Sequence, residues 1–170
     1  ELKLNGESMI KYIYGVKEES VLKFNDSIQP GEIIGRRNES ILVKTTDGSV
    51  WINQLKSLKT SKNQYTYKLP SMLELTKLAE LNIPSYDEDL DLPITNPKTY
   101  QEFSIECLND KVAVIHFDFY NGAMSTSQCQ RFSKAILSLK NIKQDIIIFS
   151  GSKRNWSNGL HLNVCENSKD

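Results

Sequence analysis

Several residue types that would define a protein class are scarce in this chain of 170 residues. Its three cysteines, Cys107, Cys129 and Cys165, form no Cys-x-x-Cys pair, and His116 and His161 are its only histidines. An odd number of widely spaced cysteines favours reduced thiols over a disulfide framework. We therefore predict a cytoplasmic protein, and so few histidines give no support for a metal site.

Long apolar runs and a net charge are lacking as well. No uninterrupted apolar run exceeds four residues, as in 146–149, whereas a membrane-spanning helix needs about 20. The first residues alternate where a signal peptide would be apolar, so the sequence predicts no membrane segment. The 21 basic and 21 acidic side chains cancel, which gives no global argument for nucleic acid. Because no initiating methionine is present, we expect the sequence to begin inside a longer reading frame.

What the chain does have is an ordinary composition with an uneven distribution of charge. With 39% hydrophobic and 25% charged residues, it is typical of a soluble globular chain of one or two domains. Residues 1–70 carry a net charge of +3, residues 71–110 of −7, and residues 111–170 of +4. The acidic middle also contains Pro84, Pro93 and Pro97, and we predict an acidic linker over residues 82–99.

The first part, residues 1–81, has the pattern of a small β-barrel of the OB-like kind. Pro30 and Gly31 suit a type II turn over residues 29–32, and the Asp-Gly pair at 47–48 predicts a hairpin. The short strands expected from this spacing are 9–16, 32–35, 40–45, 50–55 and 64–69. A polar loop is predicted over 56–63, and a short helix over 72–81 closes the unit.

The last part, residues 100–170, has the pattern of a strand–helix–strand unit, so the predicted class is α+β. Strands are expected over 103–108 and 111–119, separated by a turn. Ser125 and Gln128 have the spacing of a capping box, and one apolar face of the following helix holds Cys129, Phe132, Ala135, Ile136 and Leu139. The apolar strand 145–150 is of the kind that parallel sheets bury on both faces.

That strand has a consequence for association. Neighbouring strand residues point to opposite faces of a sheet, so one helix cannot cover Ile146, Ile147, Ile148 and Phe149 together. We therefore expect residues 100–170 to pack on the barrel or to self-associate through the incomplete sheet.

Two segments resemble known domains. Residues 29–35 and 41–55 carry a Pro-Gly turn and a Thr-x-Asp-Gly hairpin, as in the C-terminal barrel of formyltransferases. Residues 119–125 and 147–162, with the strings Phe-Tyr-Asn-Gly-Ala-Met-Ser and Trp-Ser-Asn-Gly-Leu-His-Leu, resemble the beginning of the crotonase (enoyl-CoA hydratase) fold. The order of the two is similar to the HypX/HoxX family of NiFe-hydrogenase maturation factors, and the resemblance covers most of the chain.

The resemblance implies a function for a longer parent protein. In that family one domain moves a formyl group from formyl-tetrahydrofolate to coenzyme A, and the crotonase domain releases carbon monoxide from formyl-CoA for the hydrogenase metal centre. The folate-binding domain and the remainder of the crotonase domain are not in this sequence. We therefore expect a central fragment, inactive by itself and with no tightly bound cofactor, whose partners are a CoA thioester, the other domains and the maturation machinery.

The resemblance also implies site residues. The Leu160 N–H stands where crotonases place the first oxyanion donor, and Gly159 allows a close approach of the backbone; the alternative is an ordinary glycine turn. His161 replaces the usual aspartate and is either a polar or proton-transfer group near the thioester or a hydrogen-bonding turn residue. His116 is expected to be ion-paired or solvent-facing rather than catalytic.

Seven further residues are implied as contacts for CoA. The loop at Asn121, Gly122 and Ala123 lies along the nucleotide in crotonases, although a glycine turn before the helix explains it equally well. Lys153 and Arg154 are candidates for the phosphates, with a solvated loop as the alternative. Ser157 and Asn158 complete the set.

A second class of function is a non-catalytic module that binds RNA or another protein. Residues 51–68 contain no acid, four lysines at 56, 59, 62 and 68, and the aromatic residues Trp51, Tyr65 and Tyr67. On a small barrel this pattern is typical of a single-strand nucleic-acid surface. The barrel's net charge of only +3 argues against it, and we expect a scaffold role before nucleic-acid binding.

Overall fold

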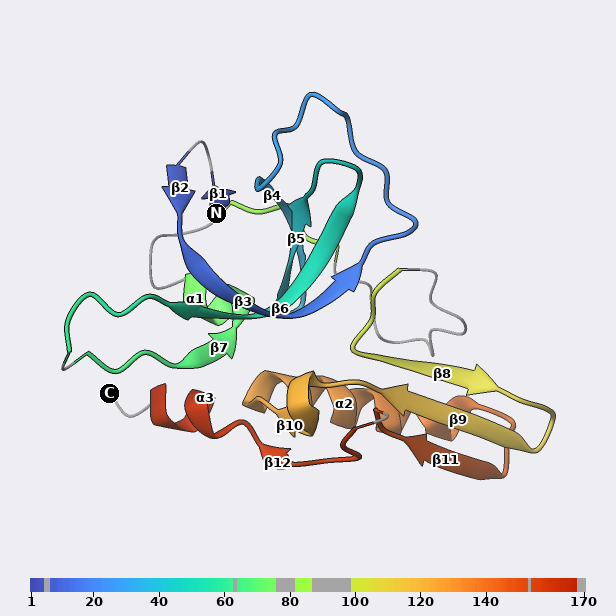
Figure 1. Ribbon diagram of the computed structural model, residues 1–170. Coiled ribbons are helices and arrows are strands. Elements are labelled where there is room, and N and C mark those ends of the chain that lie inside the picture. The colour runs from blue at the N-terminus through green and yellow to red at the C-terminus, as the bar shows by residue number, and fades with distance from the viewer. Residues whose placement is uncertain (5–6, 63, 76–81, 87–98, 153, 168–170) are drawn as a thin grey trace. The chain divides into compact units, whose positions relative to one another are not determined.

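The computed structural model describes residues 1–4, 7–62, 64–75, 82–86, 99–152 and 154–167 (Figure 1). The chain forms two compact units: Glu1–Asp87 together with Asn163–Asp170, and Glu88–Leu162. Both sheets and helices are present, so the predicted α+β class is confirmed. Within the described ranges, no helix is long and apolar enough to cross a membrane.

The first unit is mainly β-sheet. Its elements are β1 (Leu2–Leu4), β2 (Glu7–Met9), β3 (Lys11–Glu18), β4 (Ile33–Arg37), β5 (Ser40–Lys44), β6 (Ser49–Ser57), β7 (Lys68–Pro70) and α1 (Ser71–Leu75). The strands β1 and β2 form a hairpin, and the larger sheet has the order β3-β6-β5-β4 with β7 also paired to β6. The pairings among the described strands form an open sheet rather than a closed ring, so closure into a barrel stays a prediction.

Two local signals in this unit are confirmed. At the predicted type II turn, the Glu32 N–H donates to the Gln29 carbonyl at 3.1 Å, and Gly31 has the positive φ of 93° that this turn requires. Between β5 and β6 the Thr45 N–H donates to the Gly48 carbonyl at 2.9 Å, and the two strands pair from Lys44 with Ser49 onward. The Asp-Gly hairpin is therefore present.

The predicted boundaries near residue 60 are wrong. Strand β6 continues through Ser57 because β3 pairs with it as far as Lys11 opposite Ser57, so the polar loop begins later than expected. Strand β7 starts only at Lys68, which pairs with Lys56. Residues 64–66 would pair beyond the end of β6, and residues 64–67 are not a strand. Helix α1 covers 71–75, and the rest of the predicted helix, 76–81, lies outside the described residues.

The core of the first unit is made by buried apolar residues of these strands, of α1 and of the segment at Ile83. Its buried cluster is Leu2, Ile33, Ile41, Val43, Ile52, Leu55, Leu75 and Ile83. Beyond Ile83, the Arg36 N–H donates to the Pro84 carbonyl and the Tyr86 N–H to the Arg36 carbonyl, both at 2.8 Å. Residues 83–86 therefore belong to the first unit, and residues 87–98 of the predicted linker lie outside the described residues.

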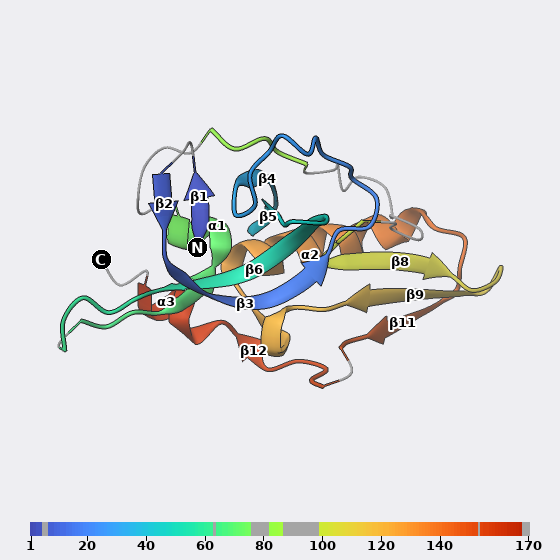
Figure 2. The same ribbon diagram turned by 45° about the horizontal axis from the view of Figure 1, so that its top comes forward.

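The second unit is a strand–helix–strand arrangement, and the three strands of its sheet lie side by side in Figure 2. Its elements are β8 (Phe103–Cys107), β9 (Val112–Phe117), η1 (Tyr120–Gly122), β10 (Ala123–Met124), α2 (Thr126–Ser138), η2 (Leu139–Asn141), β11 (Ile146–Ser150) and β12 (Gly159–Leu160), and α3 (Leu162–Asn167) follows. The sheet order is β11-β9-β8. Because β9 and β11 are parallel and α2 connects them, the predicted βαβ unit is confirmed.

Helix α2 begins at the predicted capping box. The Gln128 N–H donates to Ser125 Oγ at 3.2 Å, and the Ser125 N–H donates to Gln128 Oε1 at 3.0 Å. The side of the helix that packs on the sheet has Phe132, Ala135 and the following Leu139. Ile136, which we predict on this face, is 36% exposed, so that prediction is wrong. Its side chain lies at the edge of the face formed by Phe132, Ala135 and Leu139.

The strand β11 is covered on one side only. Ile147 packs on the core of the unit, whereas Ile146 and Ile148 are 54% and 46% exposed. The expectation that one helix cannot cover both faces is confirmed. The interpretation of a strand buried on both faces is wrong for the described residues, since β11 is the end strand of the three-stranded sheet.

Candidate functional site

The two loops that carry the predicted site residues meet in space. The strand β10 pairs with β12 in parallel, with Ala123 opposite Gly159 and Met124 opposite Leu160. Hydrogen bonds extend the contact on both sides: Asn158 N donates to the Gly122 carbonyl at 2.7 Å, and His161 N donates to the Met124 carbonyl at 2.8 Å. Backbone hydrogen bonds thus hold residues 121–124 and 158–161 side by side.

Backbone conformation explains why these residue types occur in the two loops. Asn121 and Gly122 have φ angles of 54° and 68°, and Gly159 has 74°, a left-handed region that glycine and asparagine tolerate best. A Cβ at Gly122 would approach Asn155 Cβ to 3.0 Å and the Asn158 nitrogen to 3.3 Å. Gly122 therefore permits both the turn before α2 and the close approach of the second loop.

The second loop is held against the end of β11. A Cβ on Gly151 would lie 2.7 Å from the Trp156 carbonyl oxygen, so glycine is needed where the loop turns back. The indole of Trp156 donates to the Phe149 carbonyl at 3.3 Å and meets the Phe117 ring edge-on at 5.6 Å between centroids. These contacts position residues 157–161 through the packed strands.

The Leu160 N–H is accessible in this geometry. The His161 N–H points to β10, where it meets the Met124 carbonyl, and successive N–H groups of an extended segment point to opposite sides. The Leu160 N–H is consequently directed away from β10. Leu160 is 60% exposed, and a Cβ built on Gly159 meets nothing within 4 Å, so the space beside this donor is open.

The two histidines have different surroundings. His161 is 7% exposed, and its backbone N–H holds the two loops together. His116 Nε2 lies 2.9 Å from Glu106 Oε2, and both side chains are about half exposed. The expected ion-paired, solvent-facing His116 is confirmed.

The residues implied as CoA contacts are only partly brought together. Asn158 Nδ2 donates to the Asn121 carbonyl at 2.6 Å, and the Ser157 hydroxyl accepts from the Gly159 N–H at 3.1 Å. Asn121, Ser157 and Asn158 are exposed, Gly122 is buried, and Ala123 is partly buried. Arg154 is exposed on the same loop, and Lys153 lies outside the described residues.

A buried carboxylate behind this site is not evident from the sequence. Glu102 is 2% exposed and accepts from Gln128 Nε2 at 2.8 Å and from Arg131 Nη2 at 2.6 Å. Gln128 is also the partner of Ser125 in the capping box, so the network fixes the first turn of α2 directly after β10. The sequence predicts the capping-box part of this network. Glu102 lies 26 residues before Gln128, and no pattern near it in the sequence predicts the contact.

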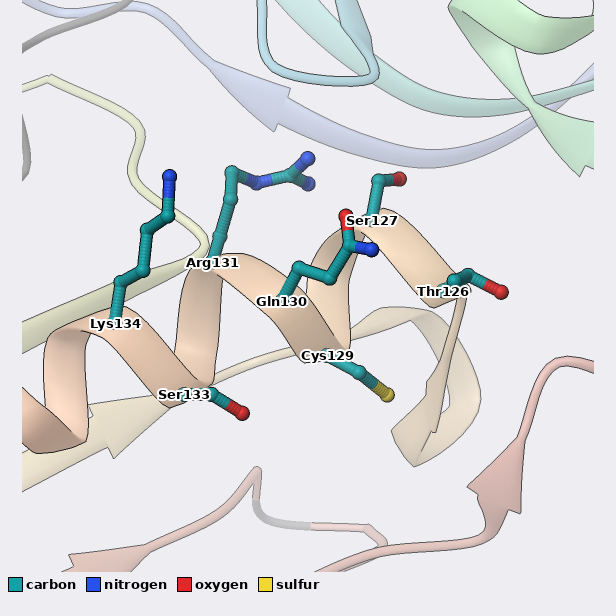
Figure 3. Close-up of a pocket in the computed structure, with 7 residues that line it drawn as sticks. All are labelled: Thr126, Ser127, Cys129, Gln130, Arg131, Ser133 and Lys134. Atoms are coloured by element: carbon teal, nitrogen blue, oxygen red, sulfur yellow. The ribbon is translucent and has the colours of Figure 1, made fainter.

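A hollow of about 530 Å³ runs along α2 (Figure 3). It is lined by Thr126, Ser127, Cys129, Gln130, Arg131, Ser133 and Lys134. Among the residues that the structure describes, none of the predicted site residues lines it, and Arg131 is engaged by Glu102. This hollow is therefore not the candidate site.

The predicted basic and aromatic surface of the first unit is corrected by the structure. Trp51 is fully buried; its indole donates to Glu19 Oε2 at 2.7 Å, and the Arg37 guanidinium lies 5.0 Å from the ring centroid. Strand residues of odd and even number point to opposite faces, so Trp51 and Lys56 cannot belong to one surface of β6. The structure describes no group of three or more metal-ligating side chains that could hold an ion.

Fold and site together define an α+β chain in which a sheet unit precedes a βαβ unit with two paired loops. No family profile matches the chain. It is 29% identical over 133 residues to the hydrogenase maturation factor HoxX of Bradyrhizobium diazoefficiens, which corresponds to 78% of this chain and 21% of that protein.

Solved structures agree with this relative. HypX from Aquifex aeolicus, in complex with tetrahydrofolic acid, matches 99% of this chain at 32% identity with a TM-score of 0.80, and an A392F-I419F variant of that protein matches with 0.79. The chain spans 28% of the length of these HypX chains. By sequence and fold, this chain belongs to the HypX/HoxX family.

Proposed function

We propose that this chain is the central segment of a hydrogenase maturation factor and that residues 121–124 and 157–161 form one wall of its CoA-thioester site. The relatives support the maturation role: one is named a hydrogenase maturation factor, and another is a HypX structure with tetrahydrofolic acid bound. In the proposed parent protein, the barrel-like first unit follows a formyltransferase domain, and the second unit opens a crotonase-like domain.

The observation that carries the proposal is the parallel pairing of β10 with β12. It sets an outward-facing N–H, that of Leu160, beside an open space next to Gly159. A preorganised N–H that meets a thioester carbonyl oxygen stabilises negative charge on that oxygen. The exposed polar groups of Asn121, Ser157 and Asn158 flank the same space and suit the polar parts of CoA.

The proposed chemistry of the parent protein is the transfer and breakdown of a formyl group. Formyl-tetrahydrofolate gives its formyl group to the CoA thiol, and tetrahydrofolate is released. The C–S bond of formyl-CoA then breaks, the formyl hydrogen leaves as a proton, and the thiolate takes up a proton, so that carbon monoxide and CoA are the products. The Leu160 N–H holds the carbonyl oxygen, and the His161 side chain is the candidate for proton transfer.

The isolated chain is expected to bind CoA weakly and to release no carbon monoxide. One N–H donor cannot form a complete oxyanion hole. Because the loss of a single donor costs roughly 10²–10³-fold in rate, we expect no detectable turnover from a hole with one donor. Carbon monoxide from formyl-CoA should be indistinguishable between the chain and buffer, and release above the buffer rate would contradict this part of the proposal.

The binding site is tested by NMR titration of the ¹⁵N-labelled chain with acetyl-CoA, with ADP as the control ligand. We expect the amides of Gly159 and Leu160 to shift with acetyl-CoA and not with ADP, because ADP lacks the thioester. The variant Leu160→Pro removes the N–H without breaking a bond to β10, and it should lose this response, whereas Leu160→Ala keeps the N–H and should retain it. Equal responses of the two variants, or no shift in these loops, would contradict the proposed site.

A further inference from the structure

A pocket in the first unit is not used by the proposed thioester site. It has a volume of about 390 Å³ and is lined by Tyr12, Tyr14, Lys56, Leu58, Lys59 and Thr66, all within one unit. The volume lies within the range of about 300–1,000 Å³ that is usual for small-molecule sites. No acidic side chain lines it.

Strand pairing explains why aromatic and basic side chains gather there. Tyr12 of β3 is opposite Lys56 of β6, and Lys56 is opposite Lys68 of β7, so the three residues share one face of the three neighbouring strands (Figure 1). Tyr14, two residues after Tyr12, points to the same face. The Lys68 ammonium lies 4.4 Å from the centroid of the Tyr14 ring, where a cation–π contact holds both groups in place.

The charges and one hydroxyl of the pocket have no counterpart in the described protein. Lys56 and Lys59 form no ion pair with a described residue. The Thr66 hydroxyl oxygen is buried and has no hydrogen-bond partner among the described residues. A buried polar atom without a partner costs stability, so the Thr66 hydroxyl marks a strained point beside the pocket rather than a ligand contact.

We propose that this pocket binds a nucleoside phosphate. The Tyr12 ring, 52% exposed, offers a face on which a base can stack, and stacking on an aromatic side chain is favourable for every base. Lys56 and Lys59 meet the phosphate as charge-assisted donors. A free nucleotide and a nucleotide of a single RNA strand share this chemistry.

The proposal is tested on the full chain by calorimetry with four probes: ADP, adenosine, orthophosphate and an oligouridylate of about ten nucleotides. ADP is expected to bind at least tenfold more tightly than adenosine or orthophosphate. If the oligonucleotide binds tenfold more tightly than ADP, and its binding weakens steeply between about 50 and 200 mM salt, the ligand is a nucleotide of an RNA strand. If ADP and the oligonucleotide bind with comparable affinity, the ligand is a free nucleotide. Binding of neither ADP nor the oligonucleotide above the level of orthophosphate would overturn the proposal.

Variants locate the binding in this pocket. Tyr12→Ala should weaken ADP binding about tenfold, and Lys56→Gln should weaken ADP without affecting adenosine. Two controls lie in the same β6–β7 connection outside the lining: Tyr65→Ala, whose ring is 84% exposed, and Lys62→Gln. Both should stay within twofold of the unchanged chain; controls that weaken ADP as much as the pocket variants would overturn the assignment.

Discussion

Single residues in the second unit have roles set by how close the backbone and charged groups come to one another. Gly151 lies where the loop after β11 passes the Trp156 backbone, and Glu102 lies where a buried carboxylate meets two donors from α2. Neither residue is in the proposed thioester wall. Both determine whether the wall is held in place, and each is testable by one substitution.

Gly151→Ala should destabilise the chain by about 1–3 kcal/mol, because the added Cβ would lie 2.7 Å from the Trp156 carbonyl oxygen and 2.8 Å from its Cα, and backbone cannot move away at low cost. Urea unfolding measures the change. Gly48→Ala is the matched control: its nearest new contact is Thr45 Oγ1 at 3.9 Å, and it should change stability by less than about 0.5 kcal/mol. Equal midpoints for the two variants would contradict the close approach.

Glu102→Gln should cost about 3 kcal/mol of unfolding free energy, because it leaves the Arg131 guanidinium, 18% exposed, without a buried carboxylate partner. Glu106→Gln gives the comparison. It breaks the pair with His116, whose side chains are about half exposed, and exposed pairs contribute less than about 1 kcal/mol. Chemical denaturation of both variants is the measurement, and a loss for Glu106→Gln as large as for Glu102→Gln would be the contrary result.

Whether such residues can be predicted depends on whether their partner is local. Ser125 and Gln128 are three positions apart, and Pro30-Gly31 define their own turn, so both were predictable. Trp51 and Lys56 lie in one basic and aromatic segment of the sequence, but strand alternation puts them on opposite faces, and Trp51 is buried against Glu19. Glu102 and the pocket of Tyr12, Lys56 and Thr66 depend on pairings between distant strands.

At the scale of elements, the first turn of α2 connects the proposed site to the core. The helix begins immediately after β10, so its N-terminal hydrogen bonds also fix where β10 ends. In the second unit, the periodicity of apolar residues was enough to predict the main strands and the helix. Strand ends were less predictable: β6 is longer and β7 is shorter than predicted, and no local pattern sets these ends.

Ser125→Ala should lower the unfolding free energy by about 1 kcal/mol, because the Gln128 N–H loses its acceptor. Ser133→Ala changes the same residue type at an exposed position of the same helix and should be neutral or slightly stabilising, since alanine has the higher helix propensity. Urea midpoints of the two variants decide: a cost for Ser133→Ala equal to that of Ser125→Ala would exclude a capping role.

At the scale of the whole molecule, one face of β11 is an uncovered apolar surface of the second unit. Ile146 and Ile148 are about half exposed on an end strand, and such strands pair readily with another chain. In a longer parent protein, further chain is expected to cover this face. In the 170-residue chain, self-association is the expected outcome.

Light scattering should therefore give a mass above 19.4 kDa that rises with concentration. Ile148→Lys places a charge on the end strand and should restore the mass of a single chain. Leu137→Lys, at a position 57% exposed on α2, should leave the association unchanged. A single-chain mass at all concentrations for the unchanged protein would contradict this expectation.

A complete relative can show whether Leu160 provides the first oxyanion donor of a formyl-CoA site. The matching segment of Aquifex aeolicus HypX is replaced by this chain, and carbon monoxide release from formyl-CoA is measured for the hybrid with Leu160, Leu160→Ala and Leu160→Pro. We expect release by the first two and a loss of about 10²–10³-fold with Leu160→Pro. Equal release by all three hybrids would exclude this role of the Leu160 N–H.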